Sequence, residues 1–376
     1  MIINNVRVYT KDFVFAKKNV RIDNGIYEKI SDEPILPGPG EQVLEAEGMR
    51  LIPGLTDIHF HGCMGKDLCD ASHEALSAMA AYEKSIGVVN ICPATMTIAY
   101  DRLIGICEMA AGHKGGQDEA QLIGINLEGP FISSQKAGAQ DARHVIRPDA
   151  GMLEELVDAS AGLVKLVTIA PEVKGAAGCI EKLCHRVHFS IGHTCADYEQ
   201  AADAFDRGAD HVTHLYNAMP PFLHRSPGLI GAAAERDDVY AELICDGIHV
   251  HPAAVRAAFG LFGSGRIVLV SDSMRACGMP DGEYELGGIP VIKRGREAKQ
   301  ANGTLAGSVT NLYECMTEAI RMGIPPEDAV RAAAYNPLAS IGLERYYGVI
   351  EEQRKASALL VDNEWKPVST CTGYLI

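Results

Sequence analysis

Hydrophobic and polar positions alternate near the start of the chain. The alternation is clear at residues 6–9, 13–22 and 27–30, and Asn24-Gly25 separates the last two runs. A period of two indicates strands with one buried face, and Asn-Gly is a preferred two-residue hairpin turn. Residues 1–52 are therefore predicted to form a small β unit.

After residue 52, apolar strand-like runs alternate with helical patterns, which occur at residues 71–86, 153–159, 196–207 and 312–322. This alternation is typical of parallel strands that are joined by helical crossovers. The strand-like runs are residues 55–59, 88–93, 122–128, 164–170, 188–193, 211–214, 240–246 and 267–272. Eight such units predict a TIM (β/α)8 barrel.

The β pattern returns after Ser340. Strands are predicted at residues 348–350 and 358–361, with a turn at Asp362-Asn363. We expect these strands to join the N-terminal ones, because a few short strands cannot form a stable unit alone. The predicted α/β fold therefore has a barrel at residues 53–344 and a discontinuous β-sandwich at residues 1–52 and 345–376.

Composition narrows the class of protein and its partners. The 376 residues are 47% hydrophobic and carry a net charge of −15, which disfavours nucleic acid and anionic membranes as partners. The 11 cysteines include no CxxC pair, which disfavours a disulfide framework or a zinc ribbon and favours a reducing cytoplasm. The first residues lack the pattern of a signal peptide, and polar residues interrupt every apolar run before it could span a membrane.

Six of the eight predicted barrel strands end in His, Glu or Asp. Active sites of TIM barrels lie at these carboxyl ends. The first run leads into His59-Phe60-His61, and residues two apart on a strand share a face, so both imidazoles are predicted to point into the barrel mouth. Two neutral imidazoles side by side suit a divalent metal. A pair of solvated loop histidines is the alternative.

Three further ligand candidates lie at the ends of later strands: Glu128, His193 and His214. Glu128 would be an expensive unpaired charge at a buried strand end, and a cation removes that difficulty. Each histidine alone could hydrogen-bond within a loop. The occurrence of three good ligands at matching strand ends favours a metal site instead.

Asp272 follows the apolar run at residues 267–271, which is predicted to deliver its carboxylate to the same barrel mouth. A helix N-cap is the alternative for such an aspartate. Beside a metal-bound water, an aspartate can act first as general base and then as general acid. Asp272 is therefore the predicted catalytic residue.

Nine segments carry a resemblance to a known family, and in chain order they are PGLTDIHFHG, LEGPFIS, KAGAQD, IGHT, VTHLYNAMPP, HRSPGLIGAA, ICDGIHVHP, VSDSMRACG and NGTLAGS. They resemble the N-acetylglucosamine-6-phosphate deacetylases of the amidohydrolase superfamily over nearly the whole chain. The resemblance implies a homodimer that hydrolyses the acetamide of this phosphorylated amino sugar. It also implies one divalent metal, Zn²⁺ or Fe²⁺, on Glu128, His193 and His214, with a second suggested by His59 and His61.

The resemblance also implies a set of substrate contacts: Ala139, Gln140, Asn217, Ala218, Arg225, Asp246, His249, Leu305, Ala306 and Gly307. Arg225 is the expected phosphate ligand, because a guanidinium offers a planar fork of donors to phosphate oxygens. Some members carry a histidine at the position of Gln140, where it is expected to polarise the acetyl carbonyl. An amide can still donate that hydrogen bond, so activity is expected to survive.

Three other functions are alternatives to this one. N-acetylgalactosamine 6-phosphate differs from the expected substrate in one sugar hydroxyl, and the sequence does not separate the two. A cyclic-amide hydrolase is disfavoured, because Lys165 stands at the start of its run and so at the wrong end of the barrel for a carboxylated metal ligand. A non-catalytic scaffold is disfavoured because all the ligands and the acid/base are present.

Overall fold

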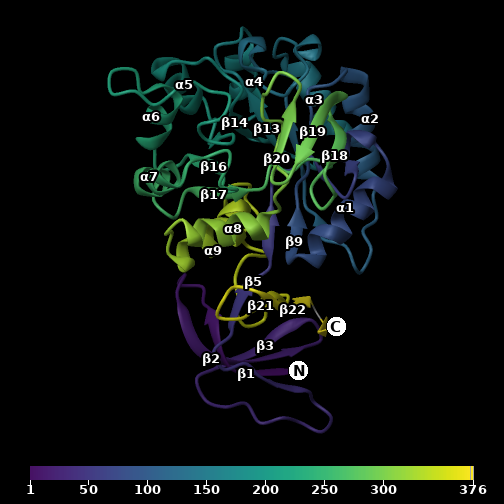
Figure 1. The fold of residues 1–376 in the computed structure, drawn as a ribbon, viewed down its shortest axis with the longest axis vertical. Coiled ribbons are helices and arrows are strands. Elements are labelled where there is room, and N and C mark those ends of the chain that lie inside the picture. Colours follow the sequence, from purple (N-terminus) through teal and green to yellow (C-terminus); the bar gives the residue numbers. More distant parts are fainter. Residues whose placement is uncertain (373, 376) are drawn as a thin grey trace.

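Parallel strands alternate with helices in the larger part of the structure, which lies above a smaller sheet that holds both termini (Figure 1). The computed structural model describes residues 1–372 and 374–375. The main parallel sheet has seven strands in the order β10 (Ala94–Thr95), β12 (Ile125–Glu128), β13 (Val164–Ile169), β14 (His188–Ile191), β15 (His211–Val212), β16 (Tyr240–Ile244) and β17 (Ile267–Val270). A three-stranded sheet has the order β11 (Gln121–Leu122), β9 (Val88–Ile91) and β6 (Leu55–Asp57).

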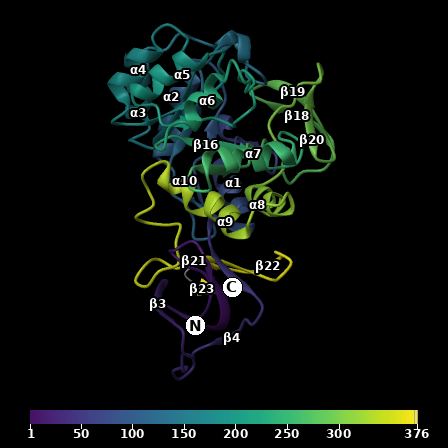
Figure 2. The ribbon, with the colours of Figure 1, turned by 90° about the vertical axis from the view of Figure 1, so that its left-hand side faces the viewer.

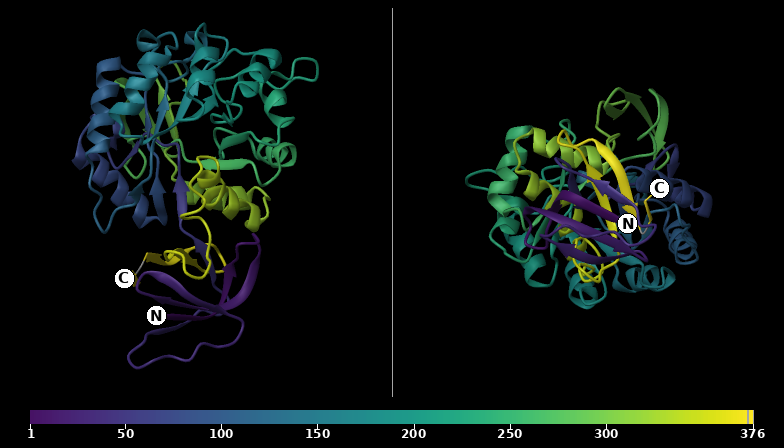
Figure 3. Two further views of the ribbon diagram at one scale, coloured as in Figure 1. Left: turned by 180° about the vertical axis from the view of Figure 1, so that it is seen from behind. Right: turned by 90° about the horizontal axis from the view of Figure 1, so that it is seen from below.

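Each of the eight predicted barrel runs contains a strand of one of these two sheets, so the predicted TIM-like architecture is confirmed. The four predicted helices are confirmed as α1 (His73–Ser85), α3 (Ala150–Ala159), α5 (Tyr198–Asp206) and α8 (Leu312–Arg321). The other helices are α2 (Tyr100–Ala111), α4 (Ala176–Leu183), α6 (Gly228–Ala234), α7 (Pro252–Phe262), α9 (Pro326–Ala334) and α10 (Asn336–Ala339). Helices surround the strands, as Figure 3 shows from behind.

The seven-stranded sheet is curled into a half-barrel, and the segment after β6 lies between its two edges. Ala94 of edge strand β10 donates its backbone N–H to Phe60 O at 2.7 Å. From the other edge, Asp272 just beyond β17 donates its backbone N–H to His59 O at 2.8 Å. These bonds satisfy backbone groups that would otherwise be exposed on both edge strands. The segment that carries the HxH pair therefore closes the curled sheet.

The smaller unit is a mixed sheet built from both ends of the chain, shown in purple and yellow in Figures 1 and 2. Its order is β23 (Tyr374–Leu375), β22 (Pro367–Thr372), β21 (Ser357–Val361), β5 (Arg50–Pro53), β1 (Ile2–Tyr9), β2 (Phe15–Asp23) and β3 (Ile26–Ser31), with β4 (Val43–Glu45) also paired to β1. The expected union of N- and C-terminal strands is confirmed, and hydrogen bonds join them into one sheet. The exact domain boundaries at residues 52 and 345 stay predictions.

Two features of the terminal sheet and its connections test the sequence predictions. The Asn24-Gly25 hairpin is confirmed, with both residues at positive φ (48° and 74°) between antiparallel strands β2 and β3. The strand predicted at residues 348–350 is wrong, because this stretch is irregular in the structure. Gly348 has a φ of +85°, which breaks the extended backbone, and Ile350 is nevertheless buried in the core of the terminal sheet.

The polypeptide passes directly from β5 of the terminal sheet through Gly54 into β6. The amino end of β6 therefore lies toward the terminal sheet, which crosses the lower end of the larger unit in Figure 3. Because the barrel strands are parallel, their carboxyl ends point away from the terminal sheet. Candidate site residues at those ends are thus gathered at the far end of the molecule.

An antiparallel sheet that was not predicted lies between β17 and α8. It consists of β18 (Gly282–Leu286), β19 (Ile289–Arg294) and β20 (Glu297–Gln300), and it projects to one side of the barrel in Figure 2. The turn Gly287-Gly288 joins its first two strands with both glycines at positive φ. In the part of the chain that the structure describes, no helix has the length and apolar character needed to cross a membrane.

Candidate metal centre and active site

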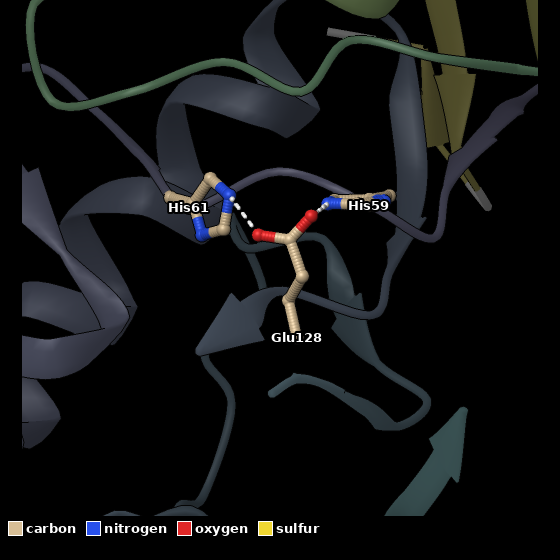
Figure 4. A group of neighbouring side chains, drawn as sticks. All are labelled: His59, His61 and Glu128. Atoms are coloured by element: carbon tan, nitrogen blue, oxygen red, sulfur yellow. Dashed lines mark ion pairs between the residues drawn. The ribbon is translucent and has the colours of Figure 1, made fainter. Parts of the chain in front are cut away.

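Glu128, the last residue of β12, lies at the centre of four histidine side chains. Its Oε1 atom is 3.2 Å from the Nε2 atoms of His59 and His193 and 3.0 Å from Nε2 of His214. Its Oε2 atom is 3.2 Å from Nε2 of His61. Figure 4 shows the two imidazoles of His59 and His61 converging on the carboxylate from the segment that closes the barrel.

The five side chains form two groups that share Glu128. One group is His59, His61 and Glu128, and the other is Glu128, His193 and His214; in each, the ligand atoms lie within 4.8 Å of one another. The Nε2 atoms of His193 and His214 face each other at 3.1 Å. This imidazole and carboxylate donor set suits Zn²⁺ or Fe²⁺.

The hydrogen bonding of the cluster is incomplete in a way that fits a cation. Among the described residues, the buried Nε2 of His59 has no hydrogen-bond partner. A buried polar atom without a partner costs free energy, and a divalent ion would satisfy this nitrogen. The residues present therefore fit one or two metal ions.

Burial and charge act against each other on the titratable groups of the cluster. Burial alone would raise the pKa of Glu128, but His59 and His193 hold that pKa well below its usual range. Burial likewise disfavours the charged form of His61, but hydrogen bonds to Asp272 and Glu128 raise its pKa to about 10. Without a cation, positive imidazoles supply the charge that Glu128 requires, and a bound metal replaces those protons.

Asp272 lies at the wall of this cluster and is only 8% exposed. Its Oδ1 atom is 3.3 Å from Nε2 of His61 and 3.9 Å from Nε2 of His59. Burial raises the pKa of a carboxyl, but the hydrogen bond to His61 and the charge of His59 hold the pKa of Asp272 below its usual value. Asp272 therefore places a carboxylate directly beside the candidate metal ligands.

Three of these residues have left-handed backbone conformations: His193 (φ 46°), His214 (φ 27°) and Asp272 (φ 46°). Such conformations cost non-glycine residues about 1–3 kcal/mol each and persist only where the surroundings hold them. The Nδ1 atom of His193 is 2.8 Å from Lys136 O, and Ser308 donates its backbone N–H to Asp272 O at 2.7 Å. The strands therefore end just before these residues, and loop contacts aim their side chains.

A cavity of about 570 Å³ opens onto the cluster. Seven of the ten expected substrate contacts line it, together with four metal-ligand candidates and Asp272; the seven are Ala139, Gln140, Asn217, Ala218, His249, Leu305 and Gly307. The side-chain amide of Gln140 donates from Nε2 to Glu128 Oε2 and accepts at Oε1 from Thr97 N (2.6 Å). Gln140 is thus fixed beside the cluster with its donor group directed at Glu128.

The other three expected contacts lie outside the lining of this cavity. Asp246 instead holds His249: its Oδ2 is 2.6 Å from His249 Nδ1, and its Oδ1 accepts from His249 N at 2.8 Å. Ala306 is fully buried. Arg225 is exposed and lines a different cavity, of about 510 Å³. The structure therefore does not bring Arg225 into the same cavity as the cluster within one chain.

Two residues at the site were missed by sequence reasoning. Lys136 lines the cavity, and its Nζ donates to Met219 O at 3.4 Å, beside Asn217 and Ala218. It belongs to the segment KAGAQD, so the motif contained the signal. Glu242 is fully buried, with Oε2 at 2.7 Å from Nδ1 of His59. The only local signal for Glu242 is a charged residue inside an apolar strand.

Comparison with known proteins identifies relatives over most of the chain. The sequence pattern of the Amidohydrolase family matches residues 50–373. The N-acetylglucosamine-6-phosphate deacetylase of Bacillus subtilis (strain 168) is 39% identical over 319 residues, which cover 84% of this chain and 81% of that protein. The N-acetylgalactosamine-6-phosphate deacetylase of Escherichia coli O157:H7 is 31% identical over 360 residues, which cover 95% and 94% of the two chains.

The fold is similar to that of a solved structure with a bound sugar. An aspartate-to-alanine mutant of N-acetyl-D-glucosamine-6-phosphate deacetylase from Mycobacterium smegmatis, in complex with N-acetyl-D-glucosamine-6-phosphate, superposes with a TM-score of 0.91. The two sequences are 28% identical, and the match covers 99% of this chain and 98% of the other.

The geometry predicts how metal content depends on single ligands. Glu128→Gln, His193→Ala and His214→Ala should each strip metal from the purified protein, because Glu128 serves both groups and few ligands remain in the second. Elemental analysis of each variant measures the loss. His185→Ala is the control, because His185 is exposed and belongs to no group of candidate ligands among the described residues. Unchanged metal content with normal turnover in any one of the three variants would remove the substituted residue from the site.

Proposed function

This chain belongs to the amidohydrolase family, among its N-acetylglucosamine-6-phosphate deacetylases, and from that premise we propose that it hydrolyses N-acetylglucosamine 6-phosphate to glucosamine 6-phosphate and acetate. One observation carries the proposal: two buried groups of metal-ligand candidates and the carboxylate of Asp272 meet at one wall of a single cavity. That arrangement suits hydrolysis of an amide, which needs an activated water and a proton for the leaving amine.

Glu128, His193 and His214 would hold one divalent cation, and His59 with His61 would hold a second that shares Glu128. Zn²⁺ and Fe²⁺ match the donors. A cation bound there lowers the pKa of a coordinated water and polarises the acetamide carbonyl. The Gln140 amide beside Glu128 is positioned to donate to the carbonyl oxygen as negative charge develops on it.

Asp272 moves the proton. As water attacks the acetamide carbon, Asp272 Oδ1 accepts a proton from it, which the low pKa of this carboxyl allows. The same proton then passes to the amine nitrogen when the C–N bond breaks, so that the sugar leaves as a neutral amine and the other product, acetic acid, ionises to acetate. Oδ1 lies 3.3 Å from Nε2 of His61, so the proposed acid/base and a candidate metal ligand are adjacent.

The phosphate of the substrate must be met by local positive charge, because the chain carries a net charge of −15. Two cavity residues supply it. Burial disfavours a charged His249, but the hydrogen bond with Asp246 outweighs this and raises the pKa of His249. Lys136 is the second cation at the cavity wall. The family resemblance assigns Arg225 to the phosphate. In the structure Arg225 lines the second cavity, of about 510 Å³.

N-acetylgalactosamine 6-phosphate is the second candidate substrate, favoured by the 31% identity to a deacetylase of that sugar. Acetate release from both epimers, each with and without the 6-phosphate, tests the proposal. We expect the highest kcat/KM on N-acetylglucosamine 6-phosphate. Absence of acetate release from all four sugars by metal-loaded protein would overturn the proposed function.

We further propose that the protein works in the cytoplasm as a homodimer. The cytoplasm is supported by ten described cysteines that are all free, since such thiols persist in a reducing compartment. The homodimer rests on the family resemblance alone. Sedimentation of the purified protein measures its oligomeric state.

Neutralising the proposed acid/base should abolish turnover without removing the metal. Asp272→Asn is expected to lower kcat by about 100-fold or more, because the amide can neither accept the proton from water nor return it. Metal content should stay at the wild-type level. Steady-state acetate release together with elemental analysis measures both effects. Retained activity would exclude Asp272 as the acid/base.

Replacing Lys136 with an uncharged residue should weaken recognition of the phosphate. Lys136→Met keeps the length of the side chain, and kcat/KM on the 6-phosphate should fall roughly 10- to 100-fold, as expected for one lost hydrogen bond to a charged group. On the unphosphorylated sugar the loss should be small. Lys165→Met is the matched control, because Lys165 lies at the amino end of β13.

Equal losses on both sugars would contradict the assignment of Lys136, since a general defect lowers both rates alike. The same comparison tests Arg225. A loss in Arg225→Ala that is confined to the phosphorylated sugar supports the assignment by resemblance, and equal losses on the two sugars remove it.

A further inference from the structure

Strand β16 carries a carboxylate in the middle of the barrel wall. Its residues Tyr240–Ile244 are otherwise mostly apolar, and Glu242 at their centre is 0% exposed. A buried carboxyl is expensive unless other groups compensate it, and an apolar side chain would fill the same position at lower cost. The contacts of Glu242 therefore indicate what its carboxylate does.

One oxygen of Glu242 contacts both groups of metal-ligand candidates. Oε2 is 2.7 Å from Nδ1 of His59 and accepts the backbone N–H of His214 at 3.1 Å. The main chain adds a third link, because Leu215 donates its N–H to Glu242 O at 2.8 Å. His59 belongs to one ligand group and His214 to the other. Glu242 is thus tied to a ligand of each group.

These contacts decide which nitrogen of His59 is free to bind a metal. A carboxylate accepts only, so Nδ1 of His59 carries the proton that it shares with Glu242. The opposite nitrogen, Nε2, faces the cluster, 3.2 Å from Glu128 Oε1, and is buried without a hydrogen-bond partner among the described residues. Its lone pair is therefore directed at the centre of the cluster.

We propose that Glu242 is a positioning residue of the metal centre. It fixes the tautomer and ring orientation of His59, strengthens that imidazole as a ligand, and holds His214 in its left-handed backbone conformation. The inference rests on the proposed function only in requiring that the cluster binds a metal. Outer partners of this kind are general in metal sites, and their loss commonly costs 10- to 100-fold in metal affinity.

Metal binding by stripped protein tests the role directly. Wild type, Glu242→Gln and Glu242→Leu are freed of metal with a chelator, and each is titrated with Zn²⁺ in competition with a coloured chelator. Glu242→Leu should bind Zn²⁺ roughly 10- to 100-fold more weakly in at least one site. Glu242→Gln should lose less, because its amide oxygen still accepts from His59 and His214. The visible spectrum of Co²⁺-loaded protein should change in the same order.

Glu83 provides a matched control. It is also a fully buried glutamate, and among the described residues both of its carboxylate oxygens lack a hydrogen-bond partner. Glu83→Gln therefore removes the same ionisable group from an equally buried position on α1. Its Zn²⁺ affinity and Co²⁺ spectrum should match those of wild type, and thermal unfolding of each metal-free variant checks that it folds.

The possible results distinguish the proposed role of Glu242 from the proposed deacetylase function. If both Glu242 variants bind Zn²⁺ as tightly as wild type, the inference is overturned while the deacetylase function stands. If Glu242→Leu does not fold, an unchanged affinity and Co²⁺ spectrum in Glu242→Gln overturn it equally. If wild type releases acetate but binds no Zn²⁺ and no Co²⁺, the metal-dependent mechanism fails and the inference with it.

Discussion

The negative charge of Glu128 is almost completely buried at the end of β12, and this burial is the constraint on which the site depends. Four imidazoles from three other parts of the barrel surround the carboxylate at 3.0–3.2 Å. Positive charge on these rings, or a metal ion that replaces their protons, is what makes the burial tolerable. The ends of four barrel segments must therefore meet at one point, and the curl of the parallel sheet brings them there.

The need to gather side chains around the buried Glu128 carboxylate also accounts for how the barrel closes and for its local backbone strain. The segment that carries His59 and His61 hydrogen-bonds to both edges of the curled sheet, so closing the barrel also places two ligands. His193, His214 and Asp272 adopt left-handed backbone just after their strands, which turns their side chains toward Glu128. Contacts from Lys136 O, Glu242 and Ser308 hold these conformations. Stability is thus given up at the residues that form the candidate site.

An acidic protein that takes an anionic substrate must concentrate positive charge at the site itself. The cavity offers Lys136 and His249 for this, and the hydrogen bond with Asp246 outweighs burial and raises the pKa of His249. Lys136 also contributes its carbonyl to the position of His193. One residue therefore joins the wall that would recognise the phosphate to the ligands that would activate water.

The sequence by itself determined the alternation of strands and helices, the pairing of both chain ends, and the polar residues at the strand ends that form the cluster. The elements and their polar ends depend on local periodicity, which a sequence displays directly, and the return of the β pattern after the barrel indicates that the two chain ends pair. It did not determine that β18–β20 form a side sheet, that residues 348–350 are irregular, or that Arg225 lies outside the cavity that Lys136 lines. Nor could it assign Glu242, which meets His59 across 183 positions of sequence. Which side chains share a cavity depends on how far the sheet curls and where the loops pass, and only long-range packing decides that.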